Sequence, residues 1–527
     1  MSSKLYFRIV DEEEYHYNLK IFEEKFNDSE KKLCVSKKIY FIRSKHILKY
    51  LFCGIYLQEV FLLTDNPKFS MVKSPQGYKY GYEANMIVLG KIYDLRDTNT
   101  WEYIISIGTD IHVDEDYPLM WACEKGYLKI VKFLVKYVDI HNWDGYGLAL
   151  ASEHGHLEIV KYLVESGVNI HKCDGGPLGR ASKKGYLEVI KYLVLNGVNI
   201  HAYYNYALVC ASEEGHLEIV KYLIESGADI NVRGNHALIY ASKNGYLEVV
   251  KYLVENGADI HAGNDDALIG ASEYGHLEVV KFLVENGANI HTNDNQILRC
   301  ASRYGHLEIV KYLVENGVDI NANCPLAWAC MGGYLEVVKY LVESGVDIHY
   351  WNNDALICAS LYGHLKVVKY LVKNGADIYA KDDHALKLAS ENGHIEVVKF
   401  LVENGANIHA ENDYALITAL KKGHLEVVKY LVENGADVHV YKDDALGYVC
   451  CKGYSELVKY LVENGADIHY DNEAALIHSS GEGHLEVVQY LVENGANVHA
   501  NDDYALKYAH SKGYLGIVKY LTEKCGK

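Results

Sequence analysis

Proline is scarce in this 527-residue chain, with five residues or about 1% of the total. Because proline interrupts helices, its scarcity favours a mainly helical protein. Long apolar runs are also missing. No stretch of 18 apolar residues occurs, so no transmembrane helix is predicted. The acidic residues Asp11 to Glu14 interrupt any secretory signal near the start. We therefore expect an intracellular protein that does not contact a membrane.

Excess positive charge is absent as well. The chain has 52 Lys and Arg against 71 Asp and Glu, a net charge of −19, which argues against binding nucleic acid over most of the surface. The first 96 residues carry +4, and the remainder carries −23. The twelve cysteines include no Cys-x-x-Cys pair, and Cys210, Cys300 and Cys358 recur at one place before a small residue. We expect buried thiols in a reducing compartment rather than disulfides or metal ligands.

The main feature that is present is an internal repeat of about 30 residues, built on the string Gly-His/Tyr-Leu-Glu-Val-Val-Lys-Tyr-Leu. Its glycine marks fourteen units, at Gly126, Gly155, Gly185, Gly215, Gly245, Gly275, Gly305, Gly333, Gly363, Gly393, Gly423, Gly453, Gly483 and Gly513. Around Gly275 the pattern predicts a first helix with Asp266 as its N-cap, then a second helix that starts at Leu277 and stops at Gly287. Neither helix can bury its apolar face alone, so the units must stack as a solenoid.

The segment at 275–291, Gly-His-Leu-Glu-Val-Val-Lys-Phe-Leu-Val-Glu-Asn-Gly-Ala-Asn-Ile-His, and its equivalents in the other units resemble the ankyrin repeat. Pro118-Leu119, Pro177-Leu178 and Pro325-Leu326 match the family's Pro-Leu at the start of the first helix. Most units have 30 residues, where the family usually has 33, which predicts a trimmed hairpin between units. The resemblance implies a mainly α solenoid at residues 97–527, with about 14 units and an N-terminal half-repeat cap. It also implies a non-enzymatic, monomeric scaffold that binds a protein through its turns and its concave helix face.

Residues 1–96 lack the repeat, and their pattern of β-branched and aromatic runs predicts a small α+β module. Strands are expected at Leu5–Val10, Lys38–Arg43, Tyr56–Leu63 and Met86–Leu95, with a short helix at His46–Phe52. The module resembles the segment that precedes ankyrin arrays in giant DNA virus proteins, which implies a viral protein in the host cytoplasm. An alternative function follows from this resemblance. The chain would be an adaptor that brings captured host proteins to a ubiquitin ligase through residues 1–96.

No catalytic motif occurs, neither a P-loop nor a Rossmann fingerprint nor a nucleophile elbow, so we expect no enzyme and no cofactor. Most of the 26 histidines fall into two columns, one after the repeat glycine and one after the Asp/Asn-Ile/Val pair. Members of a column lie about one layer apart, too far to share one metal ion, so no metal site is expected. We expect protonation of the second column near about pH 6 to place like charges in neighbouring units and loosen the array. The Lys column is expected to pair with Glu three residues earlier, as Lys161 with Glu158.

Candidate binding residues are those at which the units differ, since packing does not specify them. Large aromatic side chains replace small or polar residues in some junction turns, and aromatic anchors are common in protein interfaces. These candidate partner-binding residues are Trp143, Tyr146, Tyr203, Tyr204, Tyr206, Tyr350 and Trp351. The alternative is that they pack against neighbouring turns. One unit of 28 residues, ending at Gly333, is expected to have a shortened turn.

Overall fold

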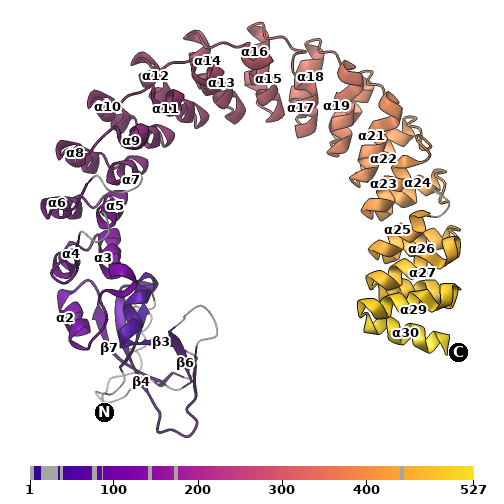
Figure 1. The fold of residues 1–527 in the computed structure, drawn as a ribbon. Helices are drawn as coiled ribbons and strands as arrows, with labels where there is room; N and C mark the ends of the chain where they lie inside the picture. Colours follow the sequence, from indigo (N-terminus) through magenta and orange to yellow (C-terminus); the bar gives the residue numbers. More distant parts are fainter. Residues whose placement is uncertain are drawn as a thin grey trace. The chain divides into compact units, whose positions relative to one another are not determined.

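The computed structural model describes residues 5–13, 34–35, 39–73, 80–85, 87–140, 145–170, 176–439 and 444–526. They form two compact units, Met1–Asp259 and Ile260–Lys527, which we call unit 1 and unit 2. Unit 1 begins with a β-sheet and continues into paired helices, whereas the described part of unit 2 contains helices and turns (Figure 1).

The sheet of unit 1 has seven strands in the order β2-β7-β4-β1-β3-β6-β5, and every neighbouring pair is antiparallel. The strands are β1 Tyr6–Val10, β2 Cys34–Val35, β3 Ile39–Arg43, β4 Tyr56–Leu62, β5 Met71–Lys73, β6 Gly81–Ala84 and β7 Ile87–Asp94. The four strands expected from sequence correspond to β1, β3, β4 and β7. Three further strands, β2, β5 and β6, are too short to stand out as an alternating pattern. The helix expected at 46–52 is a 3₁₀ helix, η1, over Ser44–Cys53.

Aromatic and aliphatic residues of β1, β3, β4, β6 and β7 form the core of the sheet, including Tyr6, Phe41 and Ile87. One polar pair is buried with them. The guanidinium of Arg8 donates to Gln58 Oε1 at 2.7 and 2.9 Å, across the β1–β4 register. Burial without these bonds would be costly for both groups. The pair therefore supports the alignment of the two central strands.

Helix α2, Thr98–Ser106, attaches to this sheet through aromatic side chains. Asp97 caps it by accepting a hydrogen bond from the Asn99 amide, at the start expected for the half-repeat cap. Trp101 is fully buried, and its Nε1 donates to the Leu95 carbonyl at 2.7 Å. The hydroxyls of Tyr93 and Tyr103 both reach Glu59 Oε1, at 2.8 and 2.9 Å. A boundary at residue 96 stays a prediction, because both sides of it lie within unit 1.

Paired helices follow α2 in unit 1. They are α3 Val113–Lys125, α4 Leu128–Leu134, α5 Tyr146–Glu153, α6 Leu157–Glu165, α7 Pro177–Lys184, α8 Leu187–Leu195, α9 Ala202–Glu213, α10 Leu217–Glu225, α11 Val232–Lys243 and α12 Leu247–Glu255. Each pair is one repeat, with an odd-numbered first helix and an even-numbered second helix. The odd-numbered helices form one layer and the even-numbered helices a second layer (Figure 1).

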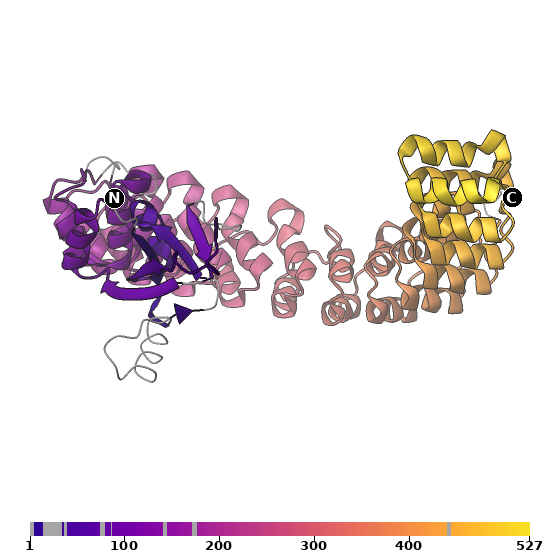
Figure 2. The ribbon, with the colours of Figure 1, turned by 90° about the horizontal axis from the view of Figure 1, so that it is seen from below.

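Unit 2 also consists of two layers of helices. Figure 2 shows its C-terminal helix pairs stacked one on the next. Its helices are α13 Ala262–Tyr274, α14 Leu277–Glu285, α15 Thr292–Arg303, α16 Leu307–Glu315, α17 Pro325–Gly332, α18 Leu335–Glu343, α19 Tyr350–Leu361, α20 Leu365–Lys373, α21 Ala380–Glu391, α22 Ile395–Glu403, α23 Tyr414–Lys422, α24 Leu425–Glu433, α25 Asp444–Lys452, α26 Ser455–Glu463, α27 Tyr470–Glu482, α28 Leu485–Glu493, α29 Ala500–Lys512 and α30 Leu515–Cys525. With the five pairs of unit 1, the described chain holds the fourteen repeats that were predicted.

Left-handed turns replace the hairpins that the ankyrin resemblance would place between repeats. Three consecutive residues with positive φ lie at the start of most first helices, as at Gly263, Asn264 and Asp265 of α13, whose φ values are 66°, 60° and 62°. No strand occurs in the described chain after β7, so the expected trimming is confirmed. The 28-residue repeat has two such non-glycine residues, Asn323 and Cys324, before Pro325 starts α17.

The expected N-cap at Asp266 is wrong. Asp265 occupies the last left-handed position, and its buried carboxylate accepts a hydrogen bond from the Asn289 amide of the next repeat at 3.0 Å. Asp266 lies inside α13 and is exposed. The left-handed turn puts Asp265 just before the regular part of the helix. Its carboxylate therefore accepts a hydrogen bond from the next repeat and does not cap its own helix.

Candidate functional site

The first histidine column is structural. His306 Nε2 donates to the Glu273 carbonyl of the preceding repeat at 2.8 Å, and its ring covers Gly275. A Cβ at Gly275 would come within 2.6 Å of that ring, and the glycine has a φ of 87°. Tyr246 covers Gly215 in the same way. The repeat glycine therefore ends a helix and also makes room for the next repeat's ring, which explains why His and Tyr both occur in this column.

Most described histidines of the second column pair with the last residue of the following left-handed turn. The Nδ1 atom of His261 donates to Asp265 at 3.0 Å, and that of His201 lies 3.1 Å from the Asn205 amide oxygen. At His469 the partner is Glu473, at 2.6 Å. This hydrogen bond raises the pKa of His469, and the Glu473 charge adds to the effect. At His469 a positive ring faces a carboxylate, and the expected loosening of the array by protonation stays a prediction.

The lysines of the second helices pair with glutamate, as predicted. Lys161 Nζ lies 2.7 Å from Glu158, and Lys221 lies 2.8 Å from Glu218. These pairs are exposed, so each contributes little to stability. They also cancel most of the positive charge along this face.

Two arginine side chains of unit 1 lie over tyrosine rings of the preceding repeat. Tyr203 and Tyr204 are the first two residues of a left-handed turn, and Tyr204 is 62% exposed. The Arg233 guanidinium lies 4.5 Å from the centre of the Tyr204 ring, a cation–π distance. Between α5 and α7, the Arg180 guanidinium lies 5.4 Å from the centre of the Tyr146 ring and forms an ion pair with Glu153. Sequence reasoning missed both arginines, although they too stand at positions where the repeats differ.

Tyr206 is 39% exposed, and one side of its ring packs against the preceding repeat. Its ring lies against Gly179 of the preceding repeat, where a Cβ would come within 2.7 Å. The hydrogen bond with Cys210 raises the pKa of Tyr206 to about 12. Burial raises the pKa of the Cys210 thiol to about 11. Cys210 and Cys300 are buried free thiols, as expected, and Cys358 is partly buried.

A cavity of about 310 Å³ opens between α7 and α9 beside these residues. Its lining is mainly apolar and includes Ile170, Pro177, Leu178, Ile200 and Tyr206. Tyr203, in the left-handed turn of α9, also lines it. This volume falls at the small end of ligand-sized pockets. An apolar side chain of a partner would fit its lining.

In unit 2, Tyr350 and Trp351 stack on each other, with ring centroids 6.0 Å apart and planes 15° apart. Trp351 begins a left-handed turn with a φ of 51° and is 66% exposed. The structure therefore places the two sets of predicted aromatic residues in different units, Tyr146 to Tyr206 in unit 1 and Tyr350–Trp351 in unit 2. Trp143 lies outside the described residues.

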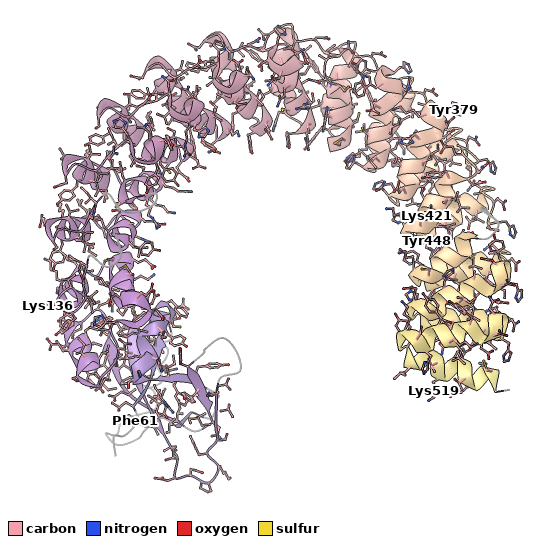
Figure 3. All side chains as sticks on the ribbon, viewed as in Figure 1. Phe61, Lys136, Tyr379, Lys421, Tyr448 and Lys519 are labelled. Atoms are coloured by element: carbon pink, nitrogen blue, oxygen red, sulfur yellow. The ribbon has the colours of Figure 1, made fainter. Side chains whose placement is uncertain are left out.

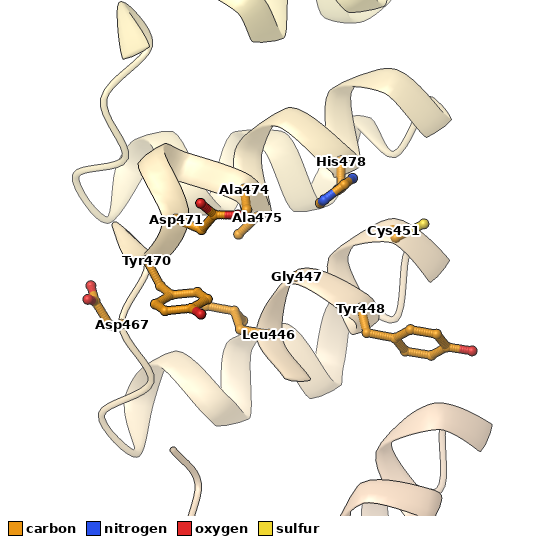
Figure 4. Close-up of a pocket in the computed structure, with 10 residues that line it drawn as sticks. All are labelled: Leu446, Gly447, Tyr448, Cys451, Asp467, Tyr470, Asp471, Ala474, Ala475 and His478. Carbon is orange, nitrogen blue, oxygen red and sulfur yellow. The ribbon is translucent and has the colours of Figure 1, made fainter. Parts of the chain in front are cut away.

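A second cavity, of about 270 Å³, lies between α25 and α27. Figure 4 shows Leu446 and Tyr470 at one end of it, and Cys451 and His478 at the other. Lys421 and Tyr448 project from the layer of first helices nearby (Figure 3).

None of the described helices combines the length and the low polarity that crossing a bilayer requires. Comparison with known families gives a match to the model for ankyrin repeats over residues 93–174, 178–264, 261–324, 322–382, 386–472 and 446–527. These segments cover nearly all of the repeat array and leave most of the β-sheet unmatched.

Individual relatives come from Acanthamoeba polyphaga mimivirus. Protein R868, named as an ankyrin repeat protein, is 46% identical over 142 residues, which is 26% of this chain and 69% of R868. The uncharacterised protein R869 is 46% identical over 137 residues, or 25% of this chain and 97% of R869. R229, also named for ankyrin repeats, is 43% identical over 120 residues, 22% of this chain and 38% of its own length. The predicted kinship with giant-virus ankyrin proteins is confirmed, and the chain belongs to the ankyrin repeat family.

Proposed function

We propose that this protein is a non-enzymatic scaffold that binds another protein through the aromatic junction turns of its repeats. Ankyrin repeats suggest protein–protein interaction in general, and the partner-binding role of particular residues is our inference. The observation that carries it is the conformation of Tyr203, Tyr204 and Trp351. All three have positive φ, at 51°, 60° and 51°.

Bulky residues are disfavoured in this left-handed region, at a cost of about 1–2 kcal/mol each relative to right-handed backbone. Other repeats place Gly, Asn or Asp at the same positions, as in Gly263-Asn264, or a charged side chain, as at Arg233 and Lys381. The aromatic residues are exposed, so burial offsets little of this cost. Strained, exposed aromatic residues on a rigid frame are best explained by a partner that buries them.

The α7–α9 cavity and Arg233 define the chemistry of such a partner in unit 1. A segment with an apolar side chain would enter the α7–α9 cavity, while its own acidic or polar groups would meet Arg233 beside Tyr204. The stacked repeats hold both features at fixed spacing, as stiff repeat surfaces do in recognition.

The double variant Y203N/Y204N of the full-length chain tests this proposal. Asparagine tolerates positive φ, so we expect the free energy of unfolding to change by no more than about 1 kcal/mol. Immobilised wild type should retain a protein from amoebal lysate, and the variant should retain at least about tenfold less of it. The control is Y274N, which removes an exposed tyrosine at the opposite end of a first helix. Equal retention by all three chains, or no retained protein, would contradict the proposal.

A further inference from the structure

Three side chains with metal-binding atoms converge in the repeat formed by α29 and α30. His499 immediately precedes α29, Asp503 is the last residue of the left-handed turn, and Cys525 ends α30. One donor atom from each lies within 4.8 Å of the others. The closest approach is 2.8 Å, between His499 Nδ1 and Asp503 Oδ1. Within the part of the chain that the structure describes, this is the one group of three or more such residues.

The thiol is what distinguishes this repeat from the rest. Twelve repeats have glycine at the position of Cys525, and each of those glycines has positive φ, as does Gly495 at 103°. There the second helix has nine residues, as in α28, whereas α30 has eleven and keeps Cys525 within the helix. The position thereby gains a side chain, and that side chain reaches the His–Asp pair. Other repeats, such as His261–Asp265, hold the same pair without a thiol.

We propose that His499, Asp503 and Cys525 bind a zinc ion, with water in the fourth position. Imidazole nitrogen, carboxylate oxygen and thiolate sulfur are all zinc ligands, with bonds of about 2.0–2.3 Å. Tetrahedral bonds of that length separate neighbouring donor atoms by roughly 3.3–3.7 Å. In the structure, His499 Nδ1 and Asp503 Oδ1 are 2.8 Å apart, and all three donor atoms lie within 4.8 Å of one another. Side-chain movements of only about 1 Å would bring them to the tetrahedral spacing.

Zinc takes the place of the proton that His499 and Asp503 now share, and the thiol also releases its proton on binding. The His499 side chain is 59% exposed and Asp503 is 42% exposed, so the ion can enter from solvent. Histidines of neighbouring repeats lie too far apart to share a metal ion. His499, Asp503 and Cys525 instead belong to one repeat, so that distance does not separate them.

The test uses full-length protein stripped of metal with a chelator and kept reduced. Zinc binding is measured by calorimetry, and cobalt substitution reports thiolate ligation through its sulfur-to-metal charge-transfer band. Wild type should bind one zinc ion more tightly than C525G or C525S by well over tenfold, since loss of an outer partner alone typically costs about 10- to 100-fold. C525G restores the residue found in the other repeats, so it should fold. C525S keeps a side chain of similar size.

The matched control is C210S, which removes one buried thiol from another repeat. It should bind zinc as wild type does and keep the cobalt band. D503N should weaken binding without removing the band. The proposal is overturned if C525G and C525S bind zinc as tightly as wild type, or if the cobalt band persists in both.

Discussion

The pair His469–Glu473 shows how one side chain sets the behaviour of a junction. Glu473 is buried, and its Oε1 atom accepts a hydrogen bond from His469 Nδ1 at 2.6 Å. In the equivalent pair of another repeat, His349 meets the neutral amide of Asn353 at 3.1 Å. The geometry is shared, but only the first pair gains an ion pair when the ring is protonated. The net charge of the chain does not distinguish the His469–Glu473 pair from the His349–Asn353 pair.

The variant E473Q should therefore destabilise the protein more in mild acid than in mild base. The pKa of His469 is raised in the folded state, so its contribution is complete below the unfolded pKa and is lost as pH rises through the folded pKa. Because the ring is mostly exposed, the difference should stay below about 1 kcal/mol between about pH 5.5 and about pH 8. Urea unfolding at both values measures it. The exposed residue Glu463 offers a control, E463Q, and an equal pH effect in both variants would exclude the pairing.

Neighbouring helix pairs are joined by buried junction residues as well as by apolar contact. Asn235 accepts from the Asp259 amide at 3.0 Å in unit 1, and Asp383 accepts from the Asn407 amide at 2.8 Å in unit 2. Each bond links residues 24 apart and satisfies a backbone amide of the next repeat. The apolar residues of the second helices, such as Val279, Val280 and Leu283, supply the continuous core.

We expect D265A to cost about 2–3 kcal/mol of unfolding free energy, because it removes a buried charged acceptor and leaves the Asn289 amide without it. The neighbouring D266A should change stability by less than about 0.5 kcal/mol, since that side chain is exposed. Chemical denaturation of the two variants makes the comparison. The reverse order would show that Asp266 is the helix cap after all.

Within each unit, the described helices form repeats that pack on the next repeat along the chain. Such arrays unfold locally, with coupling that extends over nearby repeats. The sheet of unit 1 has its own core around Phe41 and Ile87, and α2 joins it through Trp101 and Glu59. Stability should therefore differ along the chain.

Hydrogen exchange followed by mass spectrometry should detect this locality in the D265A variant. Amides of α13 to α17 should exchange faster than in wild type, while those of β1 and β4 should be unchanged. The direct bond lost lies between the repeats of α13 and α15. Faster exchange throughout the sheet would indicate a single cooperative unit instead.

Much of this protein follows from its amino-acid order alone, because the repeat is near-identical and its apolar spacing is strictly helical. The fourteen helix pairs, the helix-ending glycines, the Glu–Lys pairs and four strands of the sheet were all predictable from local pattern. The three short strands were not, since they carry too few residues to form a pattern. Tertiary structure decided which groups meet. It placed His306 over Gly275, turned Asp265 instead of Asp266 into the junction acceptor, and brought Cys525 to His499 and Asp503. These contacts depend on backbone with positive φ and on partners about 24 to 33 residues away, which local sequence cannot specify.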